Sequence, residues 1–271
     1  MSEKRIVYSD KKIKFELMID NNAYMQFSKV NSVEFQSVIS NLINNSVESI
    51  TSSGKISISL ENKNQFLTII IEDNGCGMSE DILKKAMEGG MSTKPQGLGL
   101  GLSSSIRSIK NWGSTCDIHS KIGEGTKISI QMQISEAPNW FPQNIKLSKN
   151  SVLVILDDDQ SIHDILCHRL SSLLSAHDNI KIINFKDPYK FIEFYNNYGE
   201  DKIISFLFDY EFIGSNLNGI DIIDKFKLTA NSTLVTSRFE DNYVREKCKK
   251  SGIKILPKNL AYYVPIDVSA I

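Results

Sequence analysis

Three motifs decide the fold of the first half of the chain: NLINN at residues 41–45, DNGCG at residues 73–77 and GLGLGL at residues 97–102. The first lies in a stretch with helical periodicity, the second follows an apolar stretch of strand character, and the third precedes a second helical stretch. No single motif is specific. Their order and spacing together predict one nucleotide-binding site.

The first motif lies on a predicted amphipathic helix. Its apolar stripe recurs at three- and four-residue spacing and consists of Phe35, Val38, Ile39, Leu42 and Ile43. Asn31, followed three residues later by Glu34, predicts a capping box at the start of this helix. Asn41 and Asn45 are four residues apart, so their amides share one face, where an oxygen could meet a Mg²⁺ ion together with phosphate oxygens and water. A solvated polar face is the alternative interpretation.

The second motif follows a predicted strand at residues 66–71, so Asp73 is expected where that strand ends. A carboxylate only accepts hydrogen bonds, and a fixed one beside a flat slot suits an exocyclic amine such as that of adenine. Gly75 and Gly77 would let the backbone approach the ring closely. Asp-Asn-Gly is also a common turn sequence, and that interpretation stays open.

The glycine loop leads into a predicted helix at residues 103–112, whose free N–H groups would attract phosphate oxygens. Lys94 lies just before the loop, in a polar segment that could act as a flap and bring an ammonium onto the terminal phosphate. The loop does not follow a strand and lacks a Gly-Lys-Ser/Thr sequence, so neither a dinucleotide fingerprint nor a Walker motif is indicated. The loop residues are Gly97, Leu98, Gly99, Leu100, Gly101 and Leu102.

These motifs resemble the ATP-binding catalytic domain of sensor histidine kinases, in the superfamily that also holds gyrase, mismatch-repair and chaperone ATPases. The resemblance covers roughly the first 135 residues and implies an α/β-sandwich domain at residues 1–136. It implies that Asn45 holds Mg²⁺, that Asn41 lines the phosphates and that Asp73 binds adenine. Lys94 and the glycine loop would belong to the ATP lid, and Thr126, after Gly125, also fits the ATP-binding pattern of the family.

The residue at position 41 separates two classes of ATP-using enzyme. Hydrolytic relatives carry a Glu four residues before the metal-binding Asn, whereas this chain has Asn41 there. An amide cannot act as a general base, so phosphoryl transfer to a protein is favoured over ATP hydrolysis of the mismatch-repair or gyrase type.

A composition break at residues 137–142 predicts a linker at 137–149, followed by a second domain at 150–271. In this second domain, strand and helix patterns alternate, which predicts a doubly wound parallel sheet with helices on both faces.

Polar residues follow the predicted strands of the second domain: Asp157, Asp158, Asp209, Thr236 and Lys258. The carboxyl ends of parallel strands meet at one edge, so these side chains should converge. Clustered carboxylates need cations, which Mg²⁺ and Lys258 would supply. A carboxylate in such a place can take a phosphoryl group, and a hydroxyl such as that of Thr236 could bind its oxygens.

The second half resembles a flavodoxin-like response-regulator receiver. The resemblance implies that Asp157 and Asp158 bind Mg²⁺, that Asp209 is the phosphoacceptor, and that Thr236 and Lys258 are the switch residues. Three departures stand out. The loop at residues 210–218 is longer than usual and lacks the usual proline. The usual Lys-Pro order is reversed at residues 257–258, and the residues after Lys258, interrupted by Pro265, leave little room for a last helix. A regulatory docking module that takes no phosphate is therefore an alternative.

Together the two resemblances indicate the carboxyl-terminal part of a hybrid sensor histidine kinase using ATP and Mg²⁺. Its histidine would lie on a dimerisation domain supplied by an upstream region or a partner kinase, and a downstream phosphotransfer or response-regulator protein is a further candidate partner. His163, in an Ile-His-Asp-Ile stretch, lies on a predicted receiver helix and is expected to be structural.

Composition fits two ordinary domains, with 41% hydrophobic residues and a net charge of −1, and implies neither nucleic acid nor membrane as a partner. The four cysteines show no metal-binding spacing, which predicts reduced thiols in a cytoplasmic location.

Overall fold

The computed structural model describes residues 11–87, 100–173, 179–198 and 204–269. The chain forms two compact units, Met1–Glu136 and Ala137–Ile271. Each unit has its own sheet and its own hydrophobic core.

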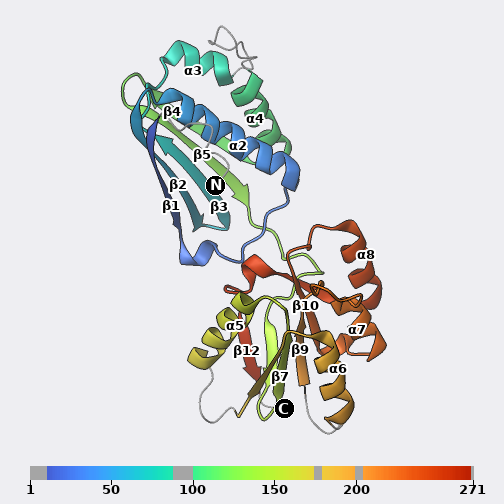
Figure 1. The fold of residues 1–271 in the computed structure, drawn as a ribbon. Coiled ribbons are helices and arrows are strands. Elements are labelled where there is room, and N and C mark those ends of the chain that lie inside the picture. Colours follow the sequence, from blue (N-terminus) through green and yellow to red (C-terminus); the bar gives the residue numbers. More distant parts are fainter. Residues whose placement is uncertain (1–10, 88–99, 174–178, 199–203, 270–271) are drawn as a thin grey trace. The chain divides into compact units, whose positions relative to one another are not determined.

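The first unit is built on a five-stranded sheet of order β1-β2-β3-β5-β4. β1 pairs in parallel with β2, and the other neighbouring strands are antiparallel. The strands are β1 (Lys12–Ile19), β2 (Ser53–Lys63), β3 (Phe66–Asp73), β4 (Thr115–Lys121) and β5 (Gly125–Gln133). Two helices, α2 (Ser32–Ser49) and α4 (Leu100–Asn111), cover one face of this sheet (Figure 1), and the shorter α3 (Glu80–Met87) contacts α4 and β4.

The capping box predicted at the start of helix α2 is confirmed in its Asn31 half, whereas the Glu34 side chain accepts a hydrogen bond from the Trp112 indole N–H at 2.9 Å. The side chain of Asn31 caps the helix, accepting a hydrogen bond from the backbone N–H of Glu34 at 3.0 Å. In the predicted apolar stripe, Val38 and Leu42 are buried, and the remaining three side chains are half-buried against the same core. The stripe therefore faces the sheet.

Strand β3 alternates between its two faces along its length. Leu67, Ile69 and Ile71 point into the core, and Asp73 is the next residue of this inward row. The period of the strand therefore places a carboxylate at the edge of an apolar core.

The second unit is built on a parallel five-stranded sheet of order β11-β10-β9-β7-β8. Its strands are β7 (Val152–Leu156), β8 (Lys181–Phe185), β9 (Ile204–Phe208), β10 (Ser232–Thr236) and β11 (Lys254–Pro257). All five residues of β7 are buried, as expected for a central strand covered on both faces.

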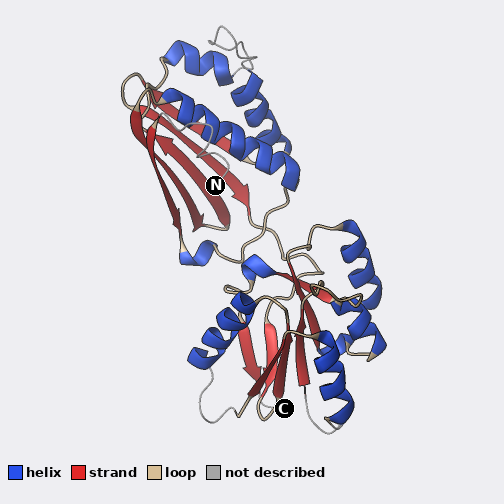
Figure 2. Ribbon diagram, in the orientation of Figure 1, coloured by secondary structure: helices blue, strands red, loops and turns tan. Residues whose placement is uncertain are grey.

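Helices cover both faces of this sheet (Figure 2). α6 (Pro188–Asn197), α7 (Gly219–Lys225) and α8 (Asn242–Ser251) pack on the face formed by Val152, Val154 and Leu156. α5 (Gln160–Leu173) lies on the other face and buries Ile162, Leu166 and Leu170. The alternation of strand and helix in the sequence predicted this arrangement.

The segment expected to be a linker differs from the prediction. Residues 137–149 belong to the second unit and contain strand β6 (Ile145–Ser148), which pairs in parallel with the last strand, β12 (Ile266–Ser269). Ile145 and Leu147 are buried, so this short strand adds to the core. A pairing between residues so distant in sequence leaves no local signal.

The chain after Lys258 forms a short 3₁₀ turn, η3 (Lys258–Leu260), and then β12, with no α-helix between Lys258 and Ser269. The guanidinium of Arg169 on α5 holds this tail by donating hydrogen bonds to the carbonyls of Ala261 and Val264, at 2.6 and 2.5 Å. Within the part of the chain that the model describes, no helix combines the length and apolar character needed to cross a membrane.

We expect Arg169→Met to lower the free energy of unfolding of the second unit by about 2–4 kcal/mol, because two buried carbonyls lose a charged donor. Urea denaturation measures this change, and loss of amide-exchange protection in β12 would locate it. His168→Met, at an exposed position on the same helix, is the matched control. Equal stability of both variants would show that Arg169 does not hold the tail.

Candidate functional site

The carboxylate of Asp73 is the fixed point of the first unit. It is only 6% exposed, and its Oδ1 accepts hydrogen bonds from the Ser49 hydroxyl and the Gly75 backbone N–H, both at 3.0 Å. Its second oxygen, Oδ2, makes no hydrogen bond to the described residues. One oxygen therefore orients the carboxylate, and the other remains available to accept from a ligand.

Asn41, Asn45 and Ser49 form a row along α2, each one helical turn from the next. The hydroxyl of Ser49 ends this row on Asp73, and its single proton is shared between Asp73 Oδ1 and the carbonyl of Ser46, 2.8 Å away. The side chains of Asn41 and Asn45 are half-buried and make no hydrogen bonds within the described residues. Two side-chain amides that make no hydrogen bond to the described residues therefore lie on the same helix face as the residue that binds the buried carboxylate.

The link from Ser49 to Asp73 was missed in the sequence. Ser49 lies four residues after Asn45, so it continues the same helix face, and this spacing could have indicated that Ser49 belongs to the site.

Gly75 and Gly77 are required by the packing of the protein itself. A β-carbon at Gly75 would lie 1.9 Å from the Ser49 hydroxyl, and one at Gly77 would lie 1.9 Å from the Lys121 carbonyl. Gly77 also has a positive φ of 65°, which disfavours other residues. The sequence interpretation is that these glycines leave room for the backbone to approach a ligand ring. In the structure, they leave room for neighbouring atoms of the protein itself.

Thr126 lies beside Asp73 because the two residues are partners in the β3–β5 register. Its hydroxyl is 2.8 Å from that of Ser120, which in turn accepts a hydrogen bond from the Met78 backbone N–H at 2.9 Å. Thr126 and Ser120 thus form a hydroxyl pair, and this pair holds the backbone at Met78, directly after the second motif.

Part of the predicted glycine loop lies outside the described residues: Lys94, Gly97, Leu98 and Gly99. Helix α4 begins at Leu100, inside the loop motif rather than after it. Leu102 packs against the core, and a β-carbon at Gly101 would meet no atom within 4 Å. Packing against the described residues therefore does not require a glycine at position 101, whereas it does at position 75.

The predicted acidic cluster of the second unit is assembled at the carboxyl edge of its sheet. Oxygens of Asp157, Asp158 and Asp209 lie within 4.8 Å of one another. The ammonium of Lys258 donates to Asp157 Oδ1 at 2.9 Å and to Asp209 Oδ2 at 2.7 Å. Four of the five residues expected to converge therefore form one charged pocket.

Thr236, the fifth residue, is buried at the end of β10, where its hydroxyl accepts a hydrogen bond from the Arg238 backbone N–H at 3.1 Å. Its strand position is the predicted one. Its side chain makes no hydrogen bond to the acidic residues within the described chain.

Burial dominates the electrostatics of this pocket. It raises the pKa of Asp209 to about 6, an effect that the Lys258 hydrogen bond opposes and the negative charge of Asp157 reinforces. Burial likewise raises the pKa of Asp157. Burial alone would lower the pKa of Lys258, but its hydrogen bonds to both carboxylates outweigh that effect and raise it.

The donor set suits a hard cation. Asp157 Oδ2 is buried and has no hydrogen-bond partner among the described residues, so one oxygen in the pocket is left for a positive ligand. Asp158 Oδ2 accepts from the Ile213 backbone N–H at 2.7 Å, and Asp209 Oδ1 accepts from that of Tyr210 at 2.6 Å. Oxygen-only ligands of this kind are those that Mg²⁺ prefers.

His163 lies beneath the pocket. It is 2% exposed, and its Nε2 is 2.7 Å from the Asp157 carbonyl oxygen. This contact ties α5 to the end of β7, which agrees with the structural role expected for His163.

Residues 30–136 match the family model described as "Histidine kinase-, DNA gyrase B-, and HSP90-like ATPase". A "Putative sensor histidine kinase NtrY-like" from Rickettsia conorii is 30% identical over 125 residues, which is 45% of this chain and 20% of that protein. "Sporulation kinase D" from Bacillus subtilis is 33% identical over 98 residues, 36% of this chain and 19% of that protein. The matched regions are thus about a fifth of the length of these relatives.

Solved structures give similar but weaker matches. The "Mycobacterial sensor histidine kinase MprB" aligns with a TM-score of 0.42 and 20% identity, covering 50% of this chain and 90% of that chain. "ShkA full-length in complex with AMPPNP" aligns with a TM-score of 0.43 and 14% identity, covering 95% of this chain and 51% of that chain. The family match and the curated relatives agree: residues 30–136 are similar to the catalytic domain of the histidine kinase-, DNA gyrase B- and HSP90-like ATPase family, of the kind found in sensor histidine kinases.

Proposed function

We propose that this chain is the ATP-binding and phosphotransfer part of a hybrid sensor histidine kinase. Its first unit binds Mg-ATP and transfers the γ-phosphoryl group to a histidine on a dimerisation domain outside residues 1–271. The observation that carries the proposal is the row of amides on α2 that ends at the Ser49–Asp73 hydrogen bond. At one end of this row, Asp73 can accept a hydrogen bond from an adenine amine. At the other end, the amide oxygens of Asn41 and Asn45 can bind Mg²⁺ or line the phosphates.

In the proposed site the free oxygen of Asp73 accepts from the adenine amine, because the other oxygen is fixed by Ser49 and Gly75. Asn45 holds Mg²⁺ through its amide oxygen, and Asn41 lines the phosphates. The ion would neutralise charge on the phosphate oxygens. Lys94 and the glycine loop at residues 97–102 would complete the phosphate side of the site.

Transfer is favoured over hydrolysis because the row on α2 carries Asn41 at the position where a hydrolase needs a carboxylate. A neutral amide cannot take a proton from water. The proposed nucleophile is therefore the unprotonated imidazole nitrogen of a histidine on the partner domain, which has no proton to lose from the attacking atom. A P–N bond forms, the P–O bond to ADP breaks with its electron pair left on ADP, and the proton on the other ring nitrogen passes to water.

The second unit is proposed to be a receiver that accepts the phosphoryl group at Asp209. Its strand order, read from the edge as β8-β7-β9-β10-β11, is the 2-1-3-4-5 order of flavodoxin-like folds. A carboxylate oxygen of Asp209 attacks phosphorus, a P–O bond forms and the P–N bond to the donor histidine breaks. The departing imidazole nitrogen keeps the electron pair and takes a proton from water.

The other pocket residues have supporting roles in this step. Asp157, Asp158 and Asp209 would hold Mg²⁺, which would offset the charge of the incoming phosphoryl oxygens. Lys258, already hydrogen-bonded to Asp209, supplies a second positive charge. Thr236 would turn its hydroxyl toward the new phosphate, giving up its contact with Arg238.

Two observations favour a second candidate, a docking module that takes no phosphate. Asp158 already accepts a hydrogen bond from the Ile213 backbone, and β12 stands where a receiver would have its last helix. A phosphodonor experiment on Asp209 separates the two candidates.

We expect Asp73→Asn to weaken Mg-ATP binding by about tenfold to a hundredfold, because a hydrogen bond to a charged group contributes roughly 1.5–3 kcal/mol. Isothermal titration calorimetry measures the affinity, and a phosphate assay in the same samples should show negligible hydrolysis by the wild type. Asp117→Asn, at an exposed position of β4, is the charge-matched control. Rapid phosphate release would instead indicate the hydrolase, and unchanged binding would remove Asp73 from the site.

Asp209 should become phosphorylated when the protein is incubated with acetyl phosphate and Mg²⁺, because a buried carboxylate beside an ammonium is a competent acceptor. Intact-mass spectrometry detects the adduct, which Asp209→Asn should abolish and Asp224→Asn, at an exposed position of α7, should leave intact. The absence of any Asp209-dependent adduct would favour the docking module.

The raised pKa of Asp209 predicts a pH dependence of stability. Without Mg²⁺, the folded state holds the Asp209 proton up to about pH 6, whereas the unfolded state releases it near the ordinary value of 3.8. This proton therefore contributes stability that is fully present below 3.8 and is lost as pH rises through about 6. Asp209→Asn should gain stability relative to the wild type over this interval.

Chemical denaturation at a series of pH values, with and without Mg²⁺, measures this effect. Bound Mg²⁺ should remove it, because the ion stabilises the ionised carboxylate. A stability difference between wild type and variant that stays constant across the interval would contradict a raised pKa.

A further inference from the structure

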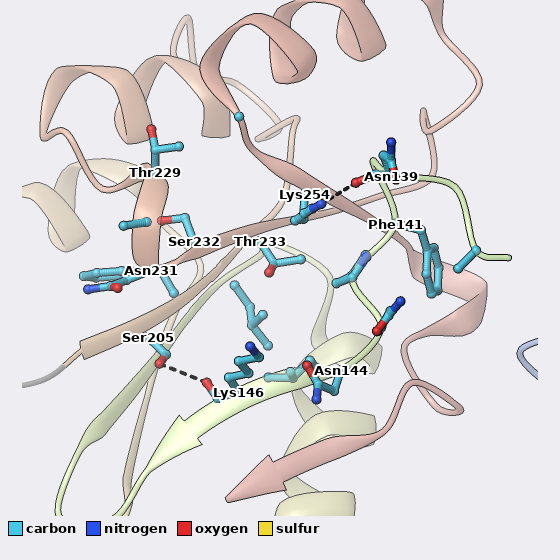
Figure 3. Close-up of a pocket in the computed structure, with 18 of the residues that line it drawn as sticks. Asn139, Phe141, Asn144, Lys146, Ser205, Thr229, Asn231, Ser232, Thr233 and Lys254 are labelled. Carbon is cyan, nitrogen blue, oxygen red and sulfur yellow. Dashed lines mark hydrogen bonds between the residues drawn. The ribbon is translucent and has the colours of Figure 1, made fainter. Parts of the chain in front are cut away.

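A second pocket, of about 630 Å³, lies within the second unit, away from the acidic cluster (Figure 3). Its wall includes the first residues of β9, β10 and β11, whose opposite ends lead to Asp209, Thr236 and Lys258. The segment from Ala137 to Lys146 closes the pocket on another side. We propose that this pocket binds a small hydroxylated anion of the sugar phosphate class.

The charges around the pocket are one-sided. Lys146 from β6 and Lys254 from β11 line it, and among the described residues no Asp or Glu does. The ammonium of Lys254 donates to the backbone carbonyl of Asn139, which is uncharged, and that of Lys146 has no hydrogen bond or ion pair within the described residues. Neither ammonium is therefore paired with a carboxylate of the described residues, and an anionic ligand would supply the missing negative charge.

One acidic side chain lies behind the wall of the pocket. Asn144 lines the pocket and donates from its amide to Asp267 Oδ2 at 3.3 Å, but Asp267 is not a lining residue. Its carboxylate is thus engaged by an amide rather than by either lysine.

Hydroxyl and amide groups fill much of the remaining polar wall, including Thr229, Asn231 and Thr233. Ser232 is the informative one. It is only 7% exposed, and its hydroxyl has no hydrogen-bond partner among the described residues, whereas the hydroxyl of Ser205 donates to the Lys146 carbonyl at 3.3 Å. A buried hydroxyl without a partner is unfavourable, and a small shift of the wall that brought a ligand oxygen to it would remove that cost.

The pocket is formed without a ligand, because backbone contacts fix its outer wall. The Trp140 carbonyl accepts from the Ile255 N–H at 2.8 Å, and the Pro265 carbonyl accepts from the Ile145 N–H at 2.8 Å. The Trp140 ring also lies under the guanidinium of Arg245, at 4.9 Å. A ligand therefore need not order this segment on binding, which favours affinity.

Size and chemistry select the ligand class. The volume falls within the range of roughly 300–1,000 Å³ typical of small-molecule sites, so a bare phosphate ion would leave most of it empty. Two lysines in the wall suit a negatively charged ligand such as a phosphate ester, and the surrounding hydroxyls and amides suit the hydroxyls of a sugar. Buried Phe141 supplies an apolar side for a carbon ring.

Calorimetric titration of the full chain with ribose 5-phosphate and, separately, with uncharged ribose tests this inference. We expect one ribose 5-phosphate to bind per chain and ribose to bind at least about tenfold more weakly, because the charged hydrogen bonds are lost. The double variant Lys146→Gln/Lys254→Gln should weaken ribose 5-phosphate binding by about tenfold or more. Lys181→Gln, at the exposed start of β8 and outside the pocket, is the matched control.

Two further variants make the result specific. Asp73→Asn should leave ribose 5-phosphate binding unchanged, which separates this pocket from the proposed ATP site. Ser232→Ala should weaken binding without lowering the urea midpoint, because the hydroxyl holds no partner in the protein. The inference is overturned if ribose 5-phosphate does not bind, if ribose binds equally well, or if the double lysine variant binds like the wild type.

Discussion

A buried carboxylate is stable in a protein only when hydrogen bonds or opposite charge replace its water, and both units of this chain depend on that constraint. Each unit places an aspartate at the end of a strand leading out of its core. Asp73 is held by neutral donors, the Ser49 hydroxyl and the Gly75 N–H. Asp209 is held by the ammonium of Lys258, and burial still raises its pKa to about 6. Neutral donors leave one site as a fixed acceptor, and charged compensation makes the other responsive to cations and pH.

The sequence could predict those parts of the sites that follow from local rules. The helical period put Asn41 and Asn45 on one face, and the rule that parallel strands end at a common edge brought Asp157, Asp158 and Asp209 together with Lys258. It could not predict what depends on contacts between distant segments. The reason for Gly75 is the Ser49 side chain on another element, and the strand character of residues 145–148 depends on β12, so neither leaves a pattern in its own neighbourhood.

The tail of the second unit shows how one long-range pairing changes what a fold can present. β12 pairs with β6, and Arg169 fixes the turn between Lys258 and β12 through two backbone carbonyls. The tail thereby joins the segment that follows the first unit in sequence to the end of the chain. If this unit is the proposed receiver, the described residues 258–269 present a 3₁₀ turn and a strand rather than the surface of an α-helix. In that proposal a change at Asp209 would act through other groups, such as the loop at residues 210–218, whose Ile213 backbone N–H donates to Asp158.

The missing base on α2 gives the proposed kinase a specific chemical character. Attack by water on ATP needs a group that removes a proton, and the amide of Asn41 cannot do so. The attacking nitrogen of a neutral imidazole carries no proton, so it needs no such group. The proposed reaction therefore depends on a partner histidine rather than on water. The barrier to transfer then depends on how the histidine is positioned, since holding two reactants in line can supply roughly 7–11 kcal/mol of the barrier reduction. Control of such an enzyme therefore lies in the placement of the partner domain, and the fixed row from Asn41 to Asp73 needs only to hold the nucleotide still.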